Sequence, residues 1–130
     1  MKLTKLSPVL RVKDVEAVLP FWEQRLGFDR KVEIPEGDGL GFVILERDGI
    51  EIMLQSESSA QGDLPALAGP SAPGSTALFI EVDDLAPFLE RIKPGDQIGP
   101  VRETFYGMRE LFLKDPAGHV VALAAKIFAS

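Results

Sequence analysis

The sequence contains few of the residues on which common catalytic centres depend. Its 130 residues include no cysteine, one histidine, one tryptophan and one tyrosine. Without cysteine, disulfide bonds and thiolate catalysis are excluded. The single histidine, His119, follows a glycine in the segment DPAGH. This position predicts a solvated residue in a hairpin turn, and no arrangement of serine, histidine and carboxylate for nucleophilic catalysis is visible around it.

Long apolar runs and an excess of positive charge are also missing. No stretch approaches the ~20 apolar residues that a membrane-spanning helix needs, and the N-terminus does not resemble a signal peptide. We therefore expect no membrane partner and a cytoplasmic location. Acidic residues number 20 against 14 basic ones, which gives a net charge of −6. The chain has no basic stripe, so nucleic acid is disfavoured as a partner, whereas a cationic ligand would suit this charge.

What the sequence does contain is an internal repeat. Residues 8–28 read as a strand, an acidic helix start, an amphipathic helix and a glycine stop, and residues 77–92 repeat this order. At an offset of 70 residues, the matched pairs are Val12 and Val82, Asp14 and Asp84, Val15 and Leu85, Leu19 and Leu89, and Trp22 and Ile92. Asp14 and Asp84 are expected N-caps, and Gly27 is expected at the left-handed position after the first helix. Pro20 predicts either an irregular first turn or a regular helix that begins near Ala17.

Runs of β-type residues, separated by turn residues, follow each helix. The expected strands are residues 6–13, 28–34, 40–46 and 50–55 in the first repeat and 76–82, 97–103, 109–114 and 119–126 in the second. We expect one domain over residues 1–130, with repeat units at about 5–56 and 76–127 and a linker at 57–75 rich in small residues, Gly and Pro. Residues 64–68 are compatible with one helical turn. The pattern predicts an α+β fold of two tandem β-α-β-β-β units.

The segments VLRVKDVEAVLPFWEQRLGF and FYGMRELFLKDPAGH, together with the paired units, resemble the vicinal-oxygen-chelate superfamily. This superfamily includes glyoxalase I, extradiol dioxygenases, fosfomycin-resistance enzymes and bleomycin resistance proteins, and the resemblance is greatest to the last group. It covers nearly the whole chain except the linker. The resemblance implies that the two units form a half-open mixed-sheet cleft, commonly completed by a second chain, and hence a homodimer.

The resemblance also locates the positions at which metal-dependent members hold their ligands. Carried over by motif, these positions are occupied by Ser7, Met53, Ala77 and Ala122. A neutral hydroxyl, a thioether and two methyl groups are poor ligands for a catalytic divalent cation. We therefore expect no bound metal, no cofactor and no enzymatic activity.

Alternation along the strands indicates which side chains line the cleft. Arg11 and Glu81 occupy equivalent places in the two repeats and predict an ion pair, with a structural or a ligand-binding role. Phe42 is similar in position to the aromatic residue that stacks on planar drug groups in bleomycin-binding relatives, and Tyr106 stands where those relatives often carry tryptophan. The expected ligand-binding residues are Arg11, Phe42, Met53, Gln55, Phe79, Glu81 and Tyr106.

Three functions remain open from the sequence. The first is a binding protein that sequesters a planar, cationic, bleomycin-like glycopeptide at a dimer groove. The second is an atypical, metal-independent enzyme of the same superfamily, for which Glu51 and Glu81 would be the acid–base candidates. The third is a structural relative that binds an unrelated small apolar molecule.

Overall fold

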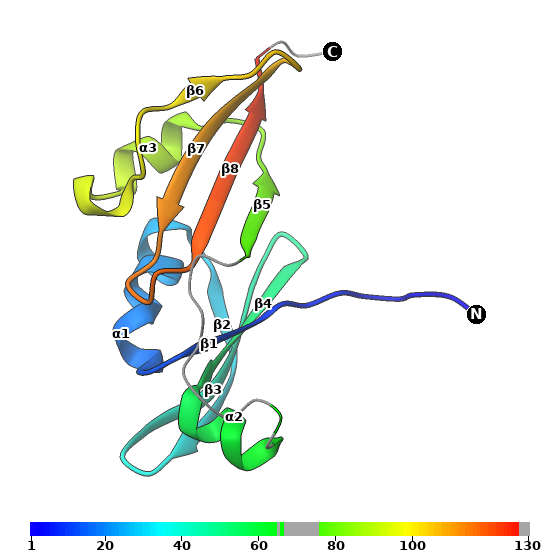
Figure 1. Cartoon of the computed structure of the whole chain (residues 1–130), viewed down its shortest axis with the longest axis vertical. Helices are drawn as coiled ribbons and strands as arrows, with labels where there is room; N and C mark the ends of the chain where they lie inside the picture. The colour runs from blue at the N-terminus through cyan, green and yellow to red at the C-terminus, as the bar shows by residue number, and fades with distance from the viewer. Residues whose placement is uncertain (65, 67–75, 128–130) are drawn as a thin grey trace. The chain divides into compact units, whose positions relative to one another are not determined.

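The computed structural model describes residues 1–64, 66 and 76–127. The chain divides into two compact units, Met1–Ser71 and Ala72–Ser130, and each unit contains one four-stranded sheet (Figure 1).

The first unit has the order strand, helix, three strands and a final short helix. Its elements are β1 (Val9–Val12), α1 (Val15–Pro20), the π-helix η1 (Phe21–Arg25), β2 (Asp29–Glu36), β3 (Gly39–Arg47), β4 (Ile50–Ser56) and α2 (Glu57–Asp63). The strand order across the sheet is β1-β4-β3-β2. β1 is parallel to β4, and the other pairs are antiparallel.

The second unit repeats this plan. Its elements are β5 (Ala77–Glu81), α3 (Ala86–Arg91), the short 3-10 helix η3 (Pro94–Asp96), β6 (Arg102–Glu103), β7 (Met108–Lys114) and β8 (Val120–Lys126). The strand order is β5-β8-β7-β6, with β5 parallel to β8. The two sheets therefore share one topology, which confirms the predicted tandem β-α-β-β-β fold.

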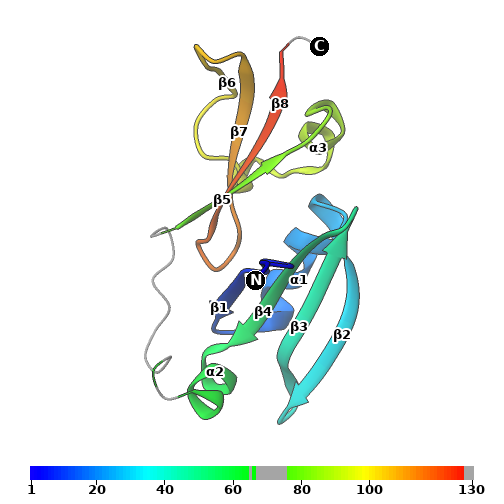
Figure 2. The ribbon, with the colours of Figure 1, turned by 90° about the vertical axis from the view of Figure 1, so that its right-hand side faces the viewer.

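The core of the first unit lies between its helix and one face of its sheet (Figure 2). Phe21 and Trp22 are fully buried and meet edge to face, with ring centroids 5.4 Å apart. Val43 and Leu45 of β3 are also fully buried. Their alternation along β3 leaves Phe42, Ile44 and Glu46 on the opposite face, away from the helix.

The helix ends as predicted, with Gly27 at a φ of 75° after the C-cap Leu26, but its irregular part does not lie where Pro20 predicted it. Asp14 is the N-cap, and its Oδ1 accepts a hydrogen bond from the Glu16 amide at 3.1 Å. The first turn is regular and begins at Val15, so both expectations for Pro20 were wrong. The irregularity follows Pro20 instead, where the chain widens into the π-helix and the Leu26 amide donates to the Phe21 carbonyl. Glu16 and Pro20 are both exposed, so the hydrogen bond that proline removes faces solvent.

Two strand boundaries were also wrong. β1 begins at Val9 rather than at residue 6, because Pro8 has no amide hydrogen to donate, and Leu6 is 87% exposed. The strand expected over 97–103 shrinks to Arg102–Glu103 and an isolated bridge between Gln97 and Leu113. Gly99, with φ of 68°, and Pro100 interrupt it.

The expected linker contains a helix, α2, that the sequence analysis did not predict. Ser56 caps it by accepting a hydrogen bond from the Ser59 amide at 3.1 Å. The helical turn expected at 64–68 lies mostly outside the described residues.

The second helix and the last hairpin bring two further corrections. Asp84 accepts a hydrogen bond from the Ala86 amide at 3.0 Å, but Leu85 occupies the N-cap position of α3, and Leu89 is exposed rather than buried. His119 lies in the predicted turn but is buried, not solvated. Its amide donates to Asp115 Oδ1 at 2.8 Å, and Asp115 is itself only 2% exposed, so the turn is anchored to a buried side chain.

Candidate functional site

The open face of the first sheet, opposite α1, carries the side chains that the alternation predicted. The strand register aligns Arg11 with Gln55 and Gln55 with Phe42, and Phe42 in turn with Ile34 on β2. Side chains at registered positions point to the same face of a sheet. A mixed row of charged, amide, aromatic and aliphatic groups therefore crosses all four strands.

One end of this face forms a pocket beside α2, which we call the α2 pocket. Its volume is about 660 Å³, and its lining combines apolar, hydroxyl, amide and carboxylate groups. The lining residues are Val9, Ile34, Glu36, Phe42, Gln55, Ser58, Ser59, Gly62 and Asp63. Ligand pockets in proteins usually measure about 300–1,000 Å³, so this volume suits a small molecule.

Hydrogen bonds hold α2 against the sheet at the edge of the pocket. Gln55 donates from Nε2 to Ser59 Oγ at 3.2 Å, and the Ser58 hydroxyl donates to Glu36. Gly41 permits this close approach, because a Cβ atom there would lie 2.9 Å from Glu36 Cβ. The short helix is thus tied to both β2 and β4, and the carboxylate of Glu36 is held at the pocket.

The structure brings together two of the predicted ligand-binding residues, Phe42 and Gln55, in the α2 pocket. Arg11 and Met53 share the open face with them but do not line the pocket. Phe79, Glu81 and Tyr106 belong to the second unit. The predicted ion pair between Arg11 and Glu81 would join the two units, and it stays a prediction.

Glu51, one of the acid–base candidates, is held as an anion. Lys5 Nζ donates to its Oε2 at 2.7 Å, and Ser7 Oγ donates to its Oε1 at 3.0 Å. These hydrogen bonds, that from Lys5 above all, lower the pKa of the Glu51 carboxyl. A carboxyl group with a lowered pKa is poorly suited to act as a general acid near neutral pH.

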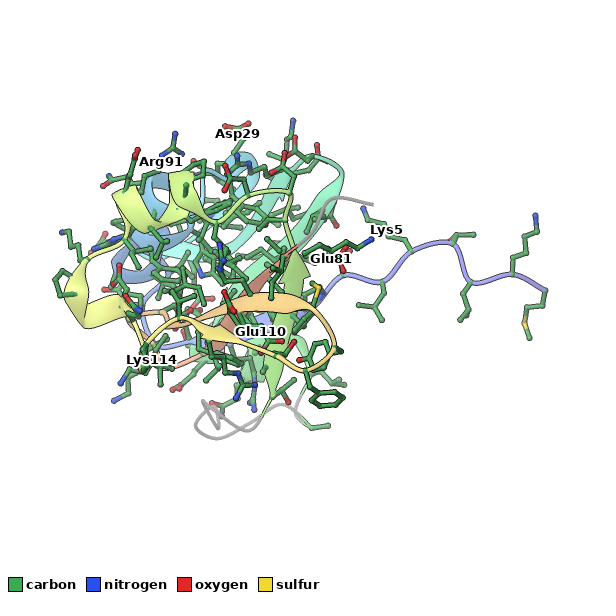
Figure 3. All side chains as sticks on the ribbon, turned by 90° about the horizontal axis from the view of Figure 1, so that it is seen from above. Lys5, Asp29, Glu81, Arg91, Glu110 and Lys114 are labelled. Carbon is green, nitrogen blue, oxygen red and sulfur yellow. The ribbon has the colours of Figure 1, made fainter. Side chains whose placement is uncertain are left out.

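The open face of the second sheet carries a second row of polar groups. Glu81 is in register with Ala124, Ala124 with Glu110, and Glu110 with Arg102. Glu110 is only 1% exposed; Figure 3 labels it together with Glu81. The Tyr106 hydroxyl donates to Glu110 Oε2 at 2.6 Å, and Arg102 Nε donates to Oε1 at 2.9 Å.

These contacts shift the titration of both partners. The hydrogen bond from Tyr106 lowers the pKa of Glu110, with a further contribution from Arg102, although burial opposes it. The same hydrogen bond raises the pKa of Tyr106. Sequence reasoning identified Tyr106 but missed Glu110 and Arg102. The signal was available, because the alternation in MRELFLK places Glu110 and Phe112 on one face of β7.

Two of the positions that would hold metal ligands have other roles in the structure. The Ser7 hydroxyl donates a hydrogen bond to Glu51, and Ala122 is buried in register with Phe79 and Phe112. Within residues 1–64, 66 and 76–127, no group of three or more histidine, aspartate or glutamate side chains is arranged to hold a metal ion. In the same part of the chain, every helix is too short or too polar to cross a membrane.

Comparison with solved structures places this fold among known proteins. A glyoxalase-related enzyme from Fulvimarina pelagi is 24% identical, with a TM-score of 0.77 over 95% of this chain and 89% of that one. A glyoxalase/bleomycin resistance protein/dioxygenase from Nocardioides is 18% identical, with a TM-score of 0.75 over 100% of this chain and 87% of that one. These two likenesses support the fold.

A third solved structure is the bleomycin-binding protein from bleomycin-producing Streptomyces verticillus in complex with copper(II)-bleomycin. It is 26% identical, with a TM-score of 0.64 over 96% of this chain and 98% of that one. No curated protein sequence matches the chain. The family model for the Glyoxalase/Bleomycin resistance protein/Dioxygenase superfamily matches residues 5–123. The chain is therefore a member of the glyoxalase/bleomycin resistance protein/dioxygenase superfamily.

Proposed function

We propose that this protein binds a planar, cationic small molecule of the bleomycin class in the α2 pocket and sequesters it without chemical conversion. The proposal includes a homodimer, in which a second chain extends the binding groove. It also includes binding without a resident metal, because Ser7, Met53, Ala77 and Ala122 replace the ligands of metal-dependent relatives.

The composition of the α2 pocket is the observation that carries this proposal. Phe42 offers a ring face, on which a planar group gains about 0.5–1.5 kcal/mol beyond the burial of area. Glu36 and Asp63 place two carboxylates around the same space, and the whole chain carries a charge of −6. A lining that combines an aromatic ring, aliphatic groups and two carboxylates favours a ligand that is both planar and positively charged.

The comparison with the bleomycin-binding protein from Streptomyces verticillus supports the choice of ligand class. That protein is 26% identical over nearly the full length of both chains. The acidic lining also distinguishes this proposal from the third possibility, an unrelated apolar ligand, for which two carboxylates in the pocket would be unfavourable.

The test is thermal unfolding with metal-free bleomycin at low salt. We expect a rise in melting temperature that saturates; at ~100 times the dissociation constant the stabilisation should be about 2.7 kcal/mol. Phe42→Ala and Gln55→Ala should weaken binding, because they remove the ring face and the amide of the pocket. The affinity should fall as salt rises, since salt screens the carboxylates.

Phe105→Ala is the matched control, because Phe105 is a fully exposed aromatic residue in the second unit and does not line the pocket. This variant should bind as the wild type does. The mass of the recovered ligand should be unchanged after long incubation, whereas conversion would favour the enzyme. A melting temperature that stays flat up to millimolar bleomycin would overturn the proposed function.

A further inference from the structure

We propose that Glu110 forms a second binding site, on the open face of the second sheet, for a small molecule that bears a guanidinium group. In the free protein the guanidinium of Arg102 occupies this site, so Arg102 blocks the binding of an external guanidinium. We call the arrangement of Glu110, Phe112 and Tyr106 the cation site. It involves none of the residues of the α2 pocket and does not depend on the proposed function.

The burial of Glu110 is the first observation behind this proposal. A buried carboxylate is unfavourable unless positive charge and hydrogen bonds compensate for the lost hydration. Tyr106 and Arg102 each donate to one oxygen of Glu110. A carboxylate offers about four acceptor positions, so the two oxygens retain capacity for a second donor each. Glu110 is thus a buried anion held in a fixed position, and Arg102 is the cation that compensates its charge.

The second observation is the way in which Arg102 is held. Its guanidinium carbon lies 4.8 Å from the centroid of the Phe112 ring, so the group contacts both a carboxylate and an aromatic face. Nevertheless, the Arg102 side chain is 61% exposed. The arginine end of this ion pair is therefore open to solvent, although the carboxylate end is buried. An external guanidinium that replaces Arg102 would keep the carboxylate paired, so it can compete with Arg102 for the site.

The chemistry of the site selects a guanidinium over other cations. A planar guanidinium stacks on an aromatic ring and donates several hydrogen bonds in one plane, whereas an ammonium presents a compact, strongly hydrated charge. Divalent metals prefer several oxygen ligands, whereas the cation site offers one carboxylate, to which Tyr106 already donates. Across β8, Glu110 and Phe112 are in register with Ala124 and Ala122, which carry no polar group that would compete.

The test is a titration of isotope-labelled protein with N-methylguanidinium, followed through the amide NMR signals of residues 102–114. The wild type should show saturable shifts centred on Tyr106, Glu110 and Phe112. Arg102→Gln should bind about fivefold more tightly or better, because it removes the internal competitor for a buried carboxylate. Glu110→Gln should lose saturable binding. Phe42→Ala, in the α2 pocket, should titrate as the wild type does, so a failure of either proposal can be recognised separately.

Arg109→Gln is the matched control on the same hairpin. Arg109 is adjacent to Glu110 but faces the other side of the sheet, where its NH2 group donates to Glu103 at 2.9 Å. This variant should bind like the wild type. Thermal unfolding gives a second readout: Arg102→Gln should lower the melting temperature, and N-methylguanidinium should restore it more than it raises that of the wild type.

Two results would overturn the cation site. One is weaker binding to Arg102→Gln than to the wild type, since Arg102 would then be part of the site rather than its internal occupant. The other is equal binding to Glu110→Gln and the wild type, which would show that the carboxylate plays no role.

Discussion

At the scale of single residues, the contact between Tyr106 and Glu110 can be measured directly. Tyr106 is the sole tyrosine of the chain, so its ionisation is the only one that tyrosinate absorbance can report. The hydrogen bond to Glu110 raises the pKa of Tyr106 in the folded protein, because it stabilises the protonated hydroxyl. We expect a titration midpoint above the ordinary value of about 10.

Glu110→Gln should move this midpoint down toward the ordinary value, whereas Glu103→Gln, on the opposite face of the hairpin, should leave it unchanged. The sign for stability follows from the raised pKa. The contribution of Tyr106 is fully present below about pH 10 and is lost as the pH rises through the folded-state pKa. The wild type should therefore lose stability in this alkaline range more steeply than Tyr106→Phe. Identical titrations of the wild type and Glu110→Gln would contradict the contact.

The residues of the candidate site were predictable to the extent that strand alternation specifies them. Gln55 followed from period-2 patterning and Phe42 from the resemblance to bleomycin-binding relatives, and the structure places both in one pocket. Glu36, Ser59 and Asp63 were missed, since their role depends on a helix inside a segment whose composition indicated a linker. Glu110 was missed because the cleft residues inferred from alternation lay on the first and last strands of each repeat, which left out β7.

At the scale of elements, the end of the first helix can be tested at Gly27. Its φ of 75° lies in the left-handed region, where residues with a Cβ atom are strained by roughly 1–2 kcal/mol. We expect Gly27→Ala to lower the free energy of unfolding by about this amount, measured by urea denaturation and followed through the buried Trp22. Gly95→Ala is the control, because a Cβ atom there would meet open space. Equal losses from the two substitutions would argue against the left-handed turn.

The elements themselves were mostly predictable, and the exceptions have local causes. Caps, turns and hydrophobic stripes specified the order of strands and helices in both units. The π-helix after Pro20 was not predictable, because hydrophobic spacing does not distinguish a widened turn from a regular one. The short β6 shows how Gly99 and Pro100 override residues that otherwise suit a strand.

At the scale of the whole molecule, we expect a homodimer. β1 and β5 are edge strands of their sheets, and both bear an exposed apolar side chain on the open face, Val9 and Phe79. Exposed apolar groups beside an unpaired strand edge favour association with a second chain. Sedimentation at micromolar concentration should give twice the mass of one chain. Val9→Lys together with Phe79→Lys should shift the equilibrium toward the monomer, and a wild type that stays monomeric would refute the expectation.

The equivalent registers of the two sheets have a consequence for how this protein diversifies. Counting across each sheet from Arg11 and from Glu81, the strand neighbours are Gln55 and then Phe42 in one unit, and Ala124 and then Glu110 in the other. Phe42 and Glu110 therefore occupy equivalent positions in the two sheets. Phe42 and Glu110 lie in different units, so each position can be substituted while the sequence of the other unit is kept. Laboratory selection should then be able to change ligand preference at Phe42 in one set of variants and at Glu110 in another. The selected substitutions could afterwards be combined in one chain.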